Sequence, residues 1–249
     1  MNLSGKTVLV TGASRGLGRG IALAFAEAGA NLALNYRSNE AEAVKVKEEV
    51  EKCGVPALCV QADVSKAADV ARMFKAIMER FGSLDVLVNN AGTTKAQDIF
   101  ATSEADWDFI LDTNLKSCFL CSKAAMEIMR ERKSGRIINI SSIVGQRGAL
   151  YGHVHYAATK SGMIGFTKTL ARTAAPLGIN VNAIAPGIIE TELLFETHGK
   201  DDVEKLAAAV PLGLGVPRDV GLAAVFLAGE GARYITGATI DVNGGMNLR

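Results

Sequence analysis

A glycine-rich turn between a short apolar run and an amphipathic stretch constrains the fold of this chain most strongly. The run Thr7-Val-Leu-Val-Thr11 is typical of a buried strand, and a helical pattern extends from about Gly16 to Ala28. Gly12, Gly16 and Gly18 open this helix, where small residues let the backbone approach a pyrophosphate. The spacing Gly-x-x-x-Gly-x-Gly differs from the common Gly-x-Gly-x-x-Gly fingerprint, so a tight turn without a ligand stays open as an alternative.

The same alternation of short apolar runs and longer amphipathic stretches continues along the chain. Six further strands are expected at residues 31–36, 56–61, 84–89, 136–141, 180–185 and 239–242. Strands joined by helical crossovers form parallel sheets that helices cover on both faces, with ligands beyond the carboxyl ends of the strands. We therefore predict an α/β fold, a single Rossmann-type domain over residues 1–249 with a doubly wound sheet of about seven parallel strands.

Composition narrows the classes of partner. Hydrophobic residues make up 49% of the chain and charged residues 21%, which is enough apolar material for a globular core. The 27 basic and 26 acidic residues nearly cancel, so neither nucleic acid nor a membrane surface is expected as a partner. No signal-peptide core or membrane-length apolar segment is present, and we expect a cytoplasmic protein.

No metal site is expected from the cysteines and histidines. Cys118 and Cys121 lie inside a helical pattern and have no second pair nearby, which is typical of buried apolar residues. His153 and His155 alternate along an expected helix, so their side chains should point away from each other.

The pair Tyr156 and Lys160 suggests proton transfer. Residues four apart share one face of a helix, and the ammonium can favour the phenolate by opposing its charge. A free tyrosine titrates near ~10, and a lower pKa would suit a proton donor to a carbonyl or a base for an alcohol. A helix can also hold Tyr and Lys at this spacing by chance, but the glycine turn upstream favours an active site.

Together with Asn89-Asn-Ala-Gly92, the glycine turn and the Tyr156/Lys160 pair resemble the short-chain dehydrogenase/reductase family along essentially the whole chain. The resemblance implies that Tyr156 is the proton donor or acceptor, and that Lys160 lowers its pKa and binds the nicotinamide ribose. Asn114 matches a helix asparagine that holds a water in a relay to the lysine.

The resemblance also implies which hydroxyl positions the substrate carbonyl. Ser142, the second serine of Asn139-Ile-Ser-Ser142, matches this residue, and its neighbour Ser141 is the alternative. Asn114, Ser142, Tyr156 and Lys160 are then the expected catalytic set.

Several loops match the cofactor-binding segments of the family. The pair Asp63-Val64 resembles the adenine contact, residues 90–92 resemble a segment packed along the cofactor, and residues 186–191 resemble a loop that closes over the nicotinamide carboxamide. The expected cofactor-binding set is Gly12, Ser14, Arg15, Gly16, Leu17, Gly18, Asn35, Tyr36, Arg37, Ser38, Asp63, Val64, Asn90, Ala91, Gly92, Tyr156, Lys160, Pro186, Gly187, Ile189 and Thr191.

The end of the second strand indicates which dinucleotide is used. NAD-preferring members of the family present a carboxylate to the ribose hydroxyls there, whereas this chain has Asn35-Tyr-Arg-Ser38. Arg37, and Arg15 in the glycine turn, could meet a 2′-phosphate, although either could also be a solvated surface residue. We predict NADP(H) as the cofactor.

Within the family the chain is most similar to 3-oxoacyl-thioester reductases, through residues 139–145, 185–191 and 241–246. The substrate could be linked to acyl carrier protein or to CoA, or could be a free ketone, sugar or other secondary alcohol. A non-catalytic NADP-binding sensor or scaffold is a more remote alternative, because such a protein would have no need of the four catalytic residues.

Two departures from the family pattern leave open whether the substrate is linked to acyl carrier protein. The stretch Tyr151-Gly-His-Val-His155 is one residue longer than usual between the serine and the tyrosine. Arg130, Arg132 and Lys133 could form one basic patch for an acidic carrier, but Leu177 stands where a second basic residue is often found.

Subunit assembly is suggested by two long helical patterns, residues 107–132 and 155–174. Both carry apolar residues on more than one face, so we expect them to pair between subunits of a homotetramer, as the resemblance also implies.

Overall fold

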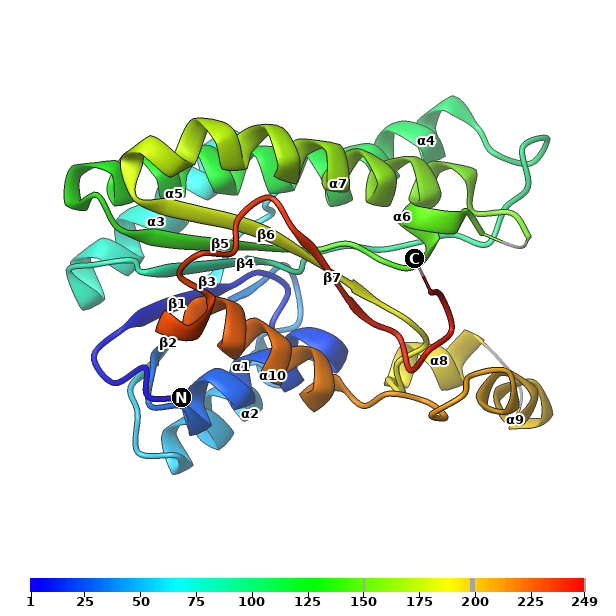
Figure 1. The fold of residues 1–249 in the computed structure, drawn as a ribbon, viewed down its shortest axis with the longest axis horizontal. Coiled ribbons are helices and arrows are strands. Elements are labelled where there is room, and N and C mark those ends of the chain that lie inside the picture. Colours follow the sequence, from blue (N-terminus) through cyan, green and yellow to red (C-terminus); the bar gives the residue numbers. More distant parts are fainter. Residues whose placement is uncertain (150, 198–199, 249) are drawn as a thin grey trace.

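The computed structural model describes residues 1–149, 151–197 and 200–248. Its centre is a parallel sheet of seven strands in the order β3-β2-β1-β4-β5-β6-β7 (Figure 1). The strands are β1 (Thr7–Val10), β2 (Asn31–Tyr36), β3 (Ala57–Gln61), β4 (Val86–Asn89), β5 (Gly135–Ile140), β6 (Ile179–Pro186) and β7 (Thr239–Val242). The order reverses between β1 and β4, which confirms the predicted doubly wound sheet.

Helices cover both faces of this sheet (Figure 1). One face carries α1 (Gly16–Glu27), α2 (Glu40–Lys52) and α10 (Pro217–Ala228), and the other carries α3 (Ala67–Phe81), α5 (Ser117–Arg132) and α7 (Val154–Ala174). The remaining elements are α4 (Glu104–Leu111), α6 (Val144–Arg147), α8 (Glu192–Thr197), α9 (Lys200–Ala208), and the short turns η1 (Asp112–Lys116), η2 (Ala175–Leu177) and η3 (Glu230–Ala232).

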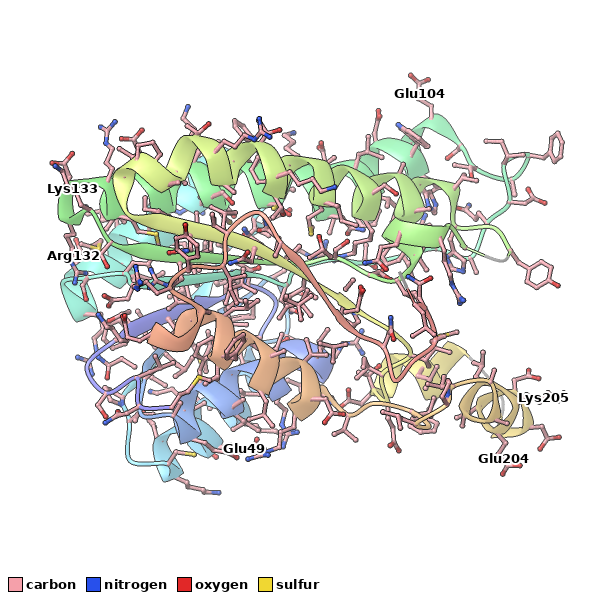
Figure 2. The ribbon with its side chains drawn as sticks, viewed as in Figure 1. Glu49, Glu104, Arg132, Lys133, Glu204 and Lys205 are labelled. Atoms are coloured by element: carbon pink, nitrogen blue, oxygen red, sulfur yellow. The ribbon has the colours of Figure 1, made fainter. Side chains whose placement is uncertain are left out.

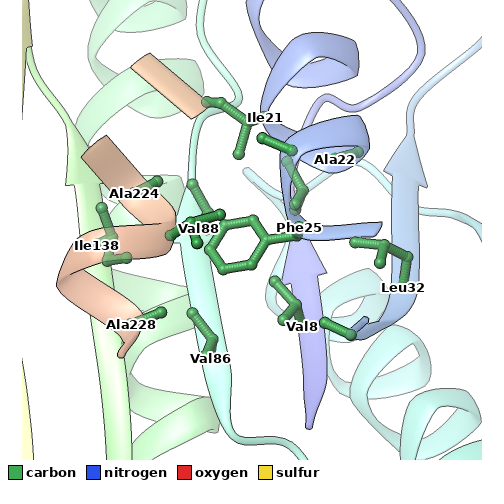
Figure 3. Packing of buried hydrophobic residues seen from close by; sticks show 14 of the residues in the cluster. Val8, Ile21, Ala22, Phe25, Leu32, Val86, Val88, Ile138, Ala224 and Ala228 are labelled. Atoms are coloured by element: carbon green, nitrogen blue, oxygen red, sulfur yellow. The ribbon is translucent and has the colours of Figure 1, made fainter. Parts of the chain in front are cut away.

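Alternation along the strands divides the core into two apolar layers. In β1, Val8 and Val10 face the α1/α10 layer while Leu9 faces the α3/α5 layer, as the period of two in a strand requires. Figure 3 shows Phe25 of α1 at the centre of the first layer, between the strands and Ala224 of α10. Strands buried on both faces need continuous apolar runs, which explains why the strands could be recognised in the sequence.

One predicted helix is divided. We expected one long helix at about residues 107–132, but the structure has α4 and α5 joined by the wider turn η1, a π-helix. The Ser117 amide bonds to the carbonyl of Asp112, five residues back, and the Ser117 hydroxyl donates to the carbonyl of Thr113 at 2.6 Å. Such π turns often occur at functional sites, and Asn114 lies in this one.

Buried amides tie the layers together next to the carboxyl ends of β4 and β5. Asn89 donates to Asn139 at 2.8 Å and to Ser122 of α5 at 3.0 Å, and Asn139 donates to Thr167 of α7 at 2.9 Å. Unpaired amides would be costly in this buried position. The network therefore fixes α5 and α7 relative to the strand ends that carry the expected site.

Among the described residues, none of the helices is both long enough and apolar enough to cross a lipid bilayer.

A first prediction concerns the glycine turn. A Cβ at Gly18 would lie 2.1 Å from the carbonyl oxygen of Gly12 and 2.6 Å from Nδ2 of Asn90, so neighbouring backbone would have to move. We expect Gly18→Ala to lower the free energy of unfolding by about 1–3 kcal/mol, as overpacking usually does. Gly231→Ala is the matched control, because its Cβ would meet only ordinary contacts. Equal melting temperatures for both variants would contradict this close packing.

Candidate active site

Tyr156 and Ser142 meet at the carboxyl edge of the sheet. Tyr156 lies in the first turn of α7, and Ser142 follows β5. The Ser142 side chain lies near enough to the Tyr156 phenol to favour its ionised form, and the Ser142 hydroxyl accepts from the amide of Val144 at 3.1 Å. The neighbouring Ser141 hydroxyl instead donates to the carbonyl of Lys160 at 2.8 Å. The structure thus places Ser142, and not Ser141, against the tyrosine.

Lys160 lies one turn further along α7, on the same side as Tyr156. Its ammonium donates to the carbonyl of Ile140 at 2.7 Å, and Nζ is 5.5 Å from the centroid of the Tyr156 ring. Burial lowers the pKa of Lys160 to about 8. Lys160 is therefore mostly protonated at neutral pH, and its ammonium lies over the Tyr156 ring.

The pKa of Tyr156 differs from expectation. Burial raises this pKa above its ordinary value, and the nearby Ser142 side chain opposes the rise only in part. A lowered value was expected from the proximity of the lysine. The direction is opposite because removing a phenolate from water is unfavourable and outweighs the effect of the serine. At neutral pH, Tyr156 is therefore a protonated phenol.

Asn114 is buried in η1 beside the loop that follows β4. Its Oδ1 accepts from the amide of Thr93 at 2.8 Å, and its Nδ2 donates to the carbonyl of Thr93 at 2.9 Å and to the hydroxyl of Thr159 at 3.2 Å. A Cβ at Gly92 would lie 3.2 Å from Asn114 Oδ1 and 3.7 Å from Lys160 Nζ. The structure thus brings Asn114 and Lys160 to the same glycine; the expected relay through water stays a prediction.

The glycine turn is fastened to the end of β4. The Asn90 side chain donates to the carbonyls of Thr11 and Gly12 at 2.9 and 3.1 Å. The Thr11 hydroxyl accepts from the amides of Asn90 and Ala91, both at 3.0 Å. These bonds hold the expected segment at residues 90–92 against the turn.

The same turn fits a pyrophosphate. Gly12 and Gly16 have φ values of +65° and +53°, in the region that favours glycine. Arg15 is the N-cap of α1, and its side chain makes no capping hydrogen bond. The start of the helix between Ser14 and Leu17 therefore has no side-chain cap. Amides and the helix dipole at such an end favour an anion.

Asn35 has a different role from the direct cofactor contact we expected. It is 2% exposed, its Oδ1 accepts from the amide of Gly12 at 3.1 Å, and its Nδ2 donates to the carbonyl of Ala62 at 3.1 Å and to those of Tyr36 and Val60, both at 3.3 Å. The side chain therefore holds the glycine turn against β3. Tyr36 is also buried, whereas Arg37 and Ser38 are exposed at the end of β2.

Two further loops lie at the same edge of the sheet. Asp63 is held by Ser65, whose amide and hydroxyl donate to it at 3.0 and 2.7 Å, and Val64 is buried. After β6, which ends at Pro186, the Gly187 amide donates to Val242 at 2.9 Å, and Ile189 pairs with Gly215.

Thr191 brings the loop after β6 back to the glycine turn. A Cβ at Gly16 would meet Cγ2 of Thr191 at 3.7 Å and a carboxylate oxygen of Glu192 at 3.5 Å. The loop after β6 therefore borders the turn, and its closure over a dinucleotide stays a prediction.

Sequence reasoning did not single out two residues that shape the site. Thr11 organises the end of β4, and its position directly before Gly12 was a usable signal. His155 was considered as a metal ligand and as part of a lengthened stretch before the tyrosine, yet its ring accepts a hydrogen bond from the amide of the adjacent Tyr156. Adjacency to the tyrosine could have indicated this role.

Comparison with known proteins gives consistent matches over the whole chain. Residues 12–247 match the family model described as Enoyl-(Acyl carrier protein) reductase. The 3-oxoacyl-[acyl-carrier-protein] reductase FabG of Staphylococcus aureus is 46% identical over 98% of both chains, and that of Vibrio cholerae is 43% identical over 100% of both. A short-chain type dehydrogenase/reductase from Mycobacterium marinum has a TM-score of 0.94 at 33% identity, covering 100% of this chain and 98% of that one.

The role of Asn35 gives a second prediction. Asn35→Asp would replace a donor that faces three carbonyls with a carboxylate oxygen, which leaves several buried groups unpaired. We expect the free energy of unfolding to fall by at least about 3 kcal/mol. Asn39→Asp is the matched control, because Asn39 caps α2 through an oxygen that Asp retains. Chemical denaturation of both variants measures the difference in their free energies of unfolding. An Asn35→Asp protein as stable as wild type would refute the structural role assigned to Asn35.

Proposed function

Because the chain belongs to the short-chain dehydrogenase/reductase family, we propose that it reduces 3-oxoacyl thioesters to 3-hydroxyacyl thioesters with NADPH. The observation that carries the proposal is the placement of Ser142 beside Tyr156, with the Lys160 ammonium 5.5 Å from the centroid of the tyrosine ring. The relatives named 3-oxoacyl-[acyl-carrier-protein] reductases, which match over the whole chain, support the substrate class.

In the proposed reaction the hydroxyls of Ser142 and Tyr156 bind the ketone oxygen. The bound nicotinamide dinucleotide supplies the hydride. As negative charge develops on the ketone oxygen, Tyr156 transfers its proton to that oxygen, for which the raised pKa keeps the phenol ready at neutral pH. The ammonium of Lys160 then stabilises the phenolate by charge attraction across a buried site.

The choice of NADP rests on the end of β2. Arg37 is exposed there, directly after two buried residues, and Arg15 is exposed in the glycine turn. Arginine recognises phosphate by paired, charge-assisted hydrogen bonds. We place the adenine ribose with its 2′-phosphate next to Arg37, and propose that residues 1–249 form one NADP-binding domain in a cytoplasmic enzyme.

The proposed homotetramer is supported by an apolar groove on the outer side of α5 and α7. The groove has a volume of about 470 Å³ and is lined by Leu111, Leu115, Phe119, Gly162 and Phe166 among others, and Phe119 is 47% exposed. A second copy of the chain would cover this surface, as we expected from the apolar residues on the outer faces of both helices.

Carrier-protein docking at the basic patch would rest mainly on Lys133. Arg130 pairs with Glu127 at 2.6 Å, whereas Arg132 and Lys6 share Asp85 at 3.2 and 3.3 Å, so the charge of Arg130 is balanced and that of Arg132 only in part. Figure 2 shows Arg132 and Lys133 at the end of the molecule opposite Glu204 and Lys205 of α9. We therefore propose that the enzyme recognises the thioester. Assays with carrier-protein and CoA thioesters distinguish the two carriers.

A third prediction tests the reaction. Wild-type protein with NADPH should reduce a 3-oxoacyl thioester, linked to carrier protein or to CoA, and should leave an enoyl thioester, a free ketone and a sugar largely unreacted. Tyr156→Phe should lower kcat by about 10²–10⁴-fold, the usual contribution of a general acid. Tyr151→Phe, at a residue that is 87% exposed, is the matched control. If the protein turned over the enoyl thioester or the free ketone but not the 3-oxoacyl thioester, the proposed substrate would be wrong.

A fourth prediction tests the cofactor. An arginine contact to phosphate contributes on the order of 1.5–3 kcal/mol, so Arg37→Ala should lower kcat/KM for NADPH about tenfold to hundredfold. The value for NADH should stay nearly constant, because NADH has no 2′-phosphate. Arg72→Ala on the exposed face of α3 is the control. Equal losses with both cofactors, or a wild-type preference for NADH, would exclude the NADP assignment.

A further inference from the structure

The first turn of α7 has an unusual partner for one of its free amides. The first amides of a helix have no partner within the helix and need another acceptor. In α7 the amide of Ala157 is the first to bond back, to His153 at 2.9 Å. The amide of Tyr156 instead donates to Nδ1 of His155 at 2.8 Å. The ring of His155 is 0% exposed, so water does not compete for this bond.

The other ring nitrogen of His155 is also engaged. Its Nε2 lies 3.3 Å from Oε1 of Gln97, whose Nε2 donates to Asp106 at 2.9 Å. Because the donating end of the Gln97 amide is committed to the carboxylate, its oxygen must accept from His155. Lys95 pairs with the same carboxylate and holds it in place.

Both bonds require the same form of the ring. Nε2 must carry a hydrogen to donate to Gln97, and Nδ1 must be bare to accept from Tyr156. This is the neutral imidazole in one tautomer. An added proton on Nδ1 would place two donors face to face at the first turn of the helix that carries the tyrosine.

The same contacts join α7 to the loop after β4. The amide of His153 donates to the carbonyl of Gln97 at 2.8 Å, and Asn114 bonds to Thr93 at the start of this loop. A change at His155 would therefore be transmitted to the position of the Tyr156 hydroxyl, and small misplacements of reacting groups are costly.

We propose that His155 is a positioning residue that holds Tyr156 in its reactive place only as the neutral imidazole with hydrogen on Nε2, and that its protonation causes a decrease of activity at acid pH. The effect on activity rests on the proposed reductase function. The state of the ring does not, and can be measured in the protein alone.

Burial and the charged groups around His155 determine the pH at which its ring is protonated. Burial lowers the pKa of His155; His153 at the N-cap and Lys95 lower it further, and Asp106 of α4 opposes them. Lys95, Gln97 and Ser103 hold the pKa of Asp106 well below its usual range, so Asp106 does not titrate together with the histidine. As pH falls, His155 should gain its proton below the ordinary value of about 6.5, and activity should decrease with it.

A direct test is NMR of the full-length protein with 13C- and 15N-labelled histidine rings. The chain has three histidines, and His→Asn variants assign their signals. We expect the signal of His155 to be that of the Nε2–H tautomer, with a titration midpoint below about 6.5. The Nδ1–H tautomer, or a midpoint at or above that value, would overturn the proposal whether or not the protein is a reductase.

Variants test the effect on catalysis. His155→Phe removes both hydrogen bonds and should lower kcat about tenfold to hundredfold across the pH range, with unchanged NADPH affinity. His155→Asn keeps an oxygen near the position of Nδ1 that cannot be protonated in this range, so it should restore most of the turnover and abolish the acid-side decrease.

His153→Asn is the matched control, because asparagine tolerates the left-handed backbone of His153, with φ of +58°. It should keep the acid-side decrease and move it to higher pH, because one charge that lowers the pKa of His155 is lost. The proposal is overturned if His155→Asn keeps the decrease, if His153→Asn abolishes it, or if His155→Phe turns over like wild type. Wild-type protein that reduces no thioester would instead refute the proposed function.

Discussion

The hydrogen bonds between the ends of β1 and β4 support every other part of the site. Thr11 and Asn90 join the glycine turn to residues 90–92 through side chain and backbone together. The loop that continues from Gly92 is held by Asn114 and then by the first turn of α7. The position of the proposed dinucleotide and the position of Tyr156 therefore depend on one continuous set of bonds.

Sequence patterns predicted the features that local composition determines. The strands were found, with ends shifted by at most two residues, because both faces of the sheet are covered and most of each strand is apolar. The glycine turn and the Tyr156/Lys160 pair were recognisable because their spacing in the chain carries the chemistry. For the same reason the sequence alone shows the family resemblance, and the comparisons confirm it.

Other features depend on distant contacts that no local pattern contains. Asn35 bonds to carbonyls in and after β3, so its role emerges only when the sheet is assembled. The pKa of Tyr156 rises because α7 is packed against its surroundings, whereas the spacing to Lys160 suggested a decrease. Ser141 and Ser142 are chemically identical in the sequence, and only the path of the chain after β5 directs one to the tyrosine.

The π turn at Asn114 separates the needs of the site from those of the core. A π turn holds one residue more than the α-helical path would, and each residue of an α-helix turns the chain by about 100°. Deleting a single residue from η1 would therefore convert the π turn into an α-helical turn and leave α5 in phase, with Cys121, Ala125 and Met129 still buried. The extra residue therefore displaces the helix locally where Asn114 meets the loop after β4, while the packing of α5 against the core is kept.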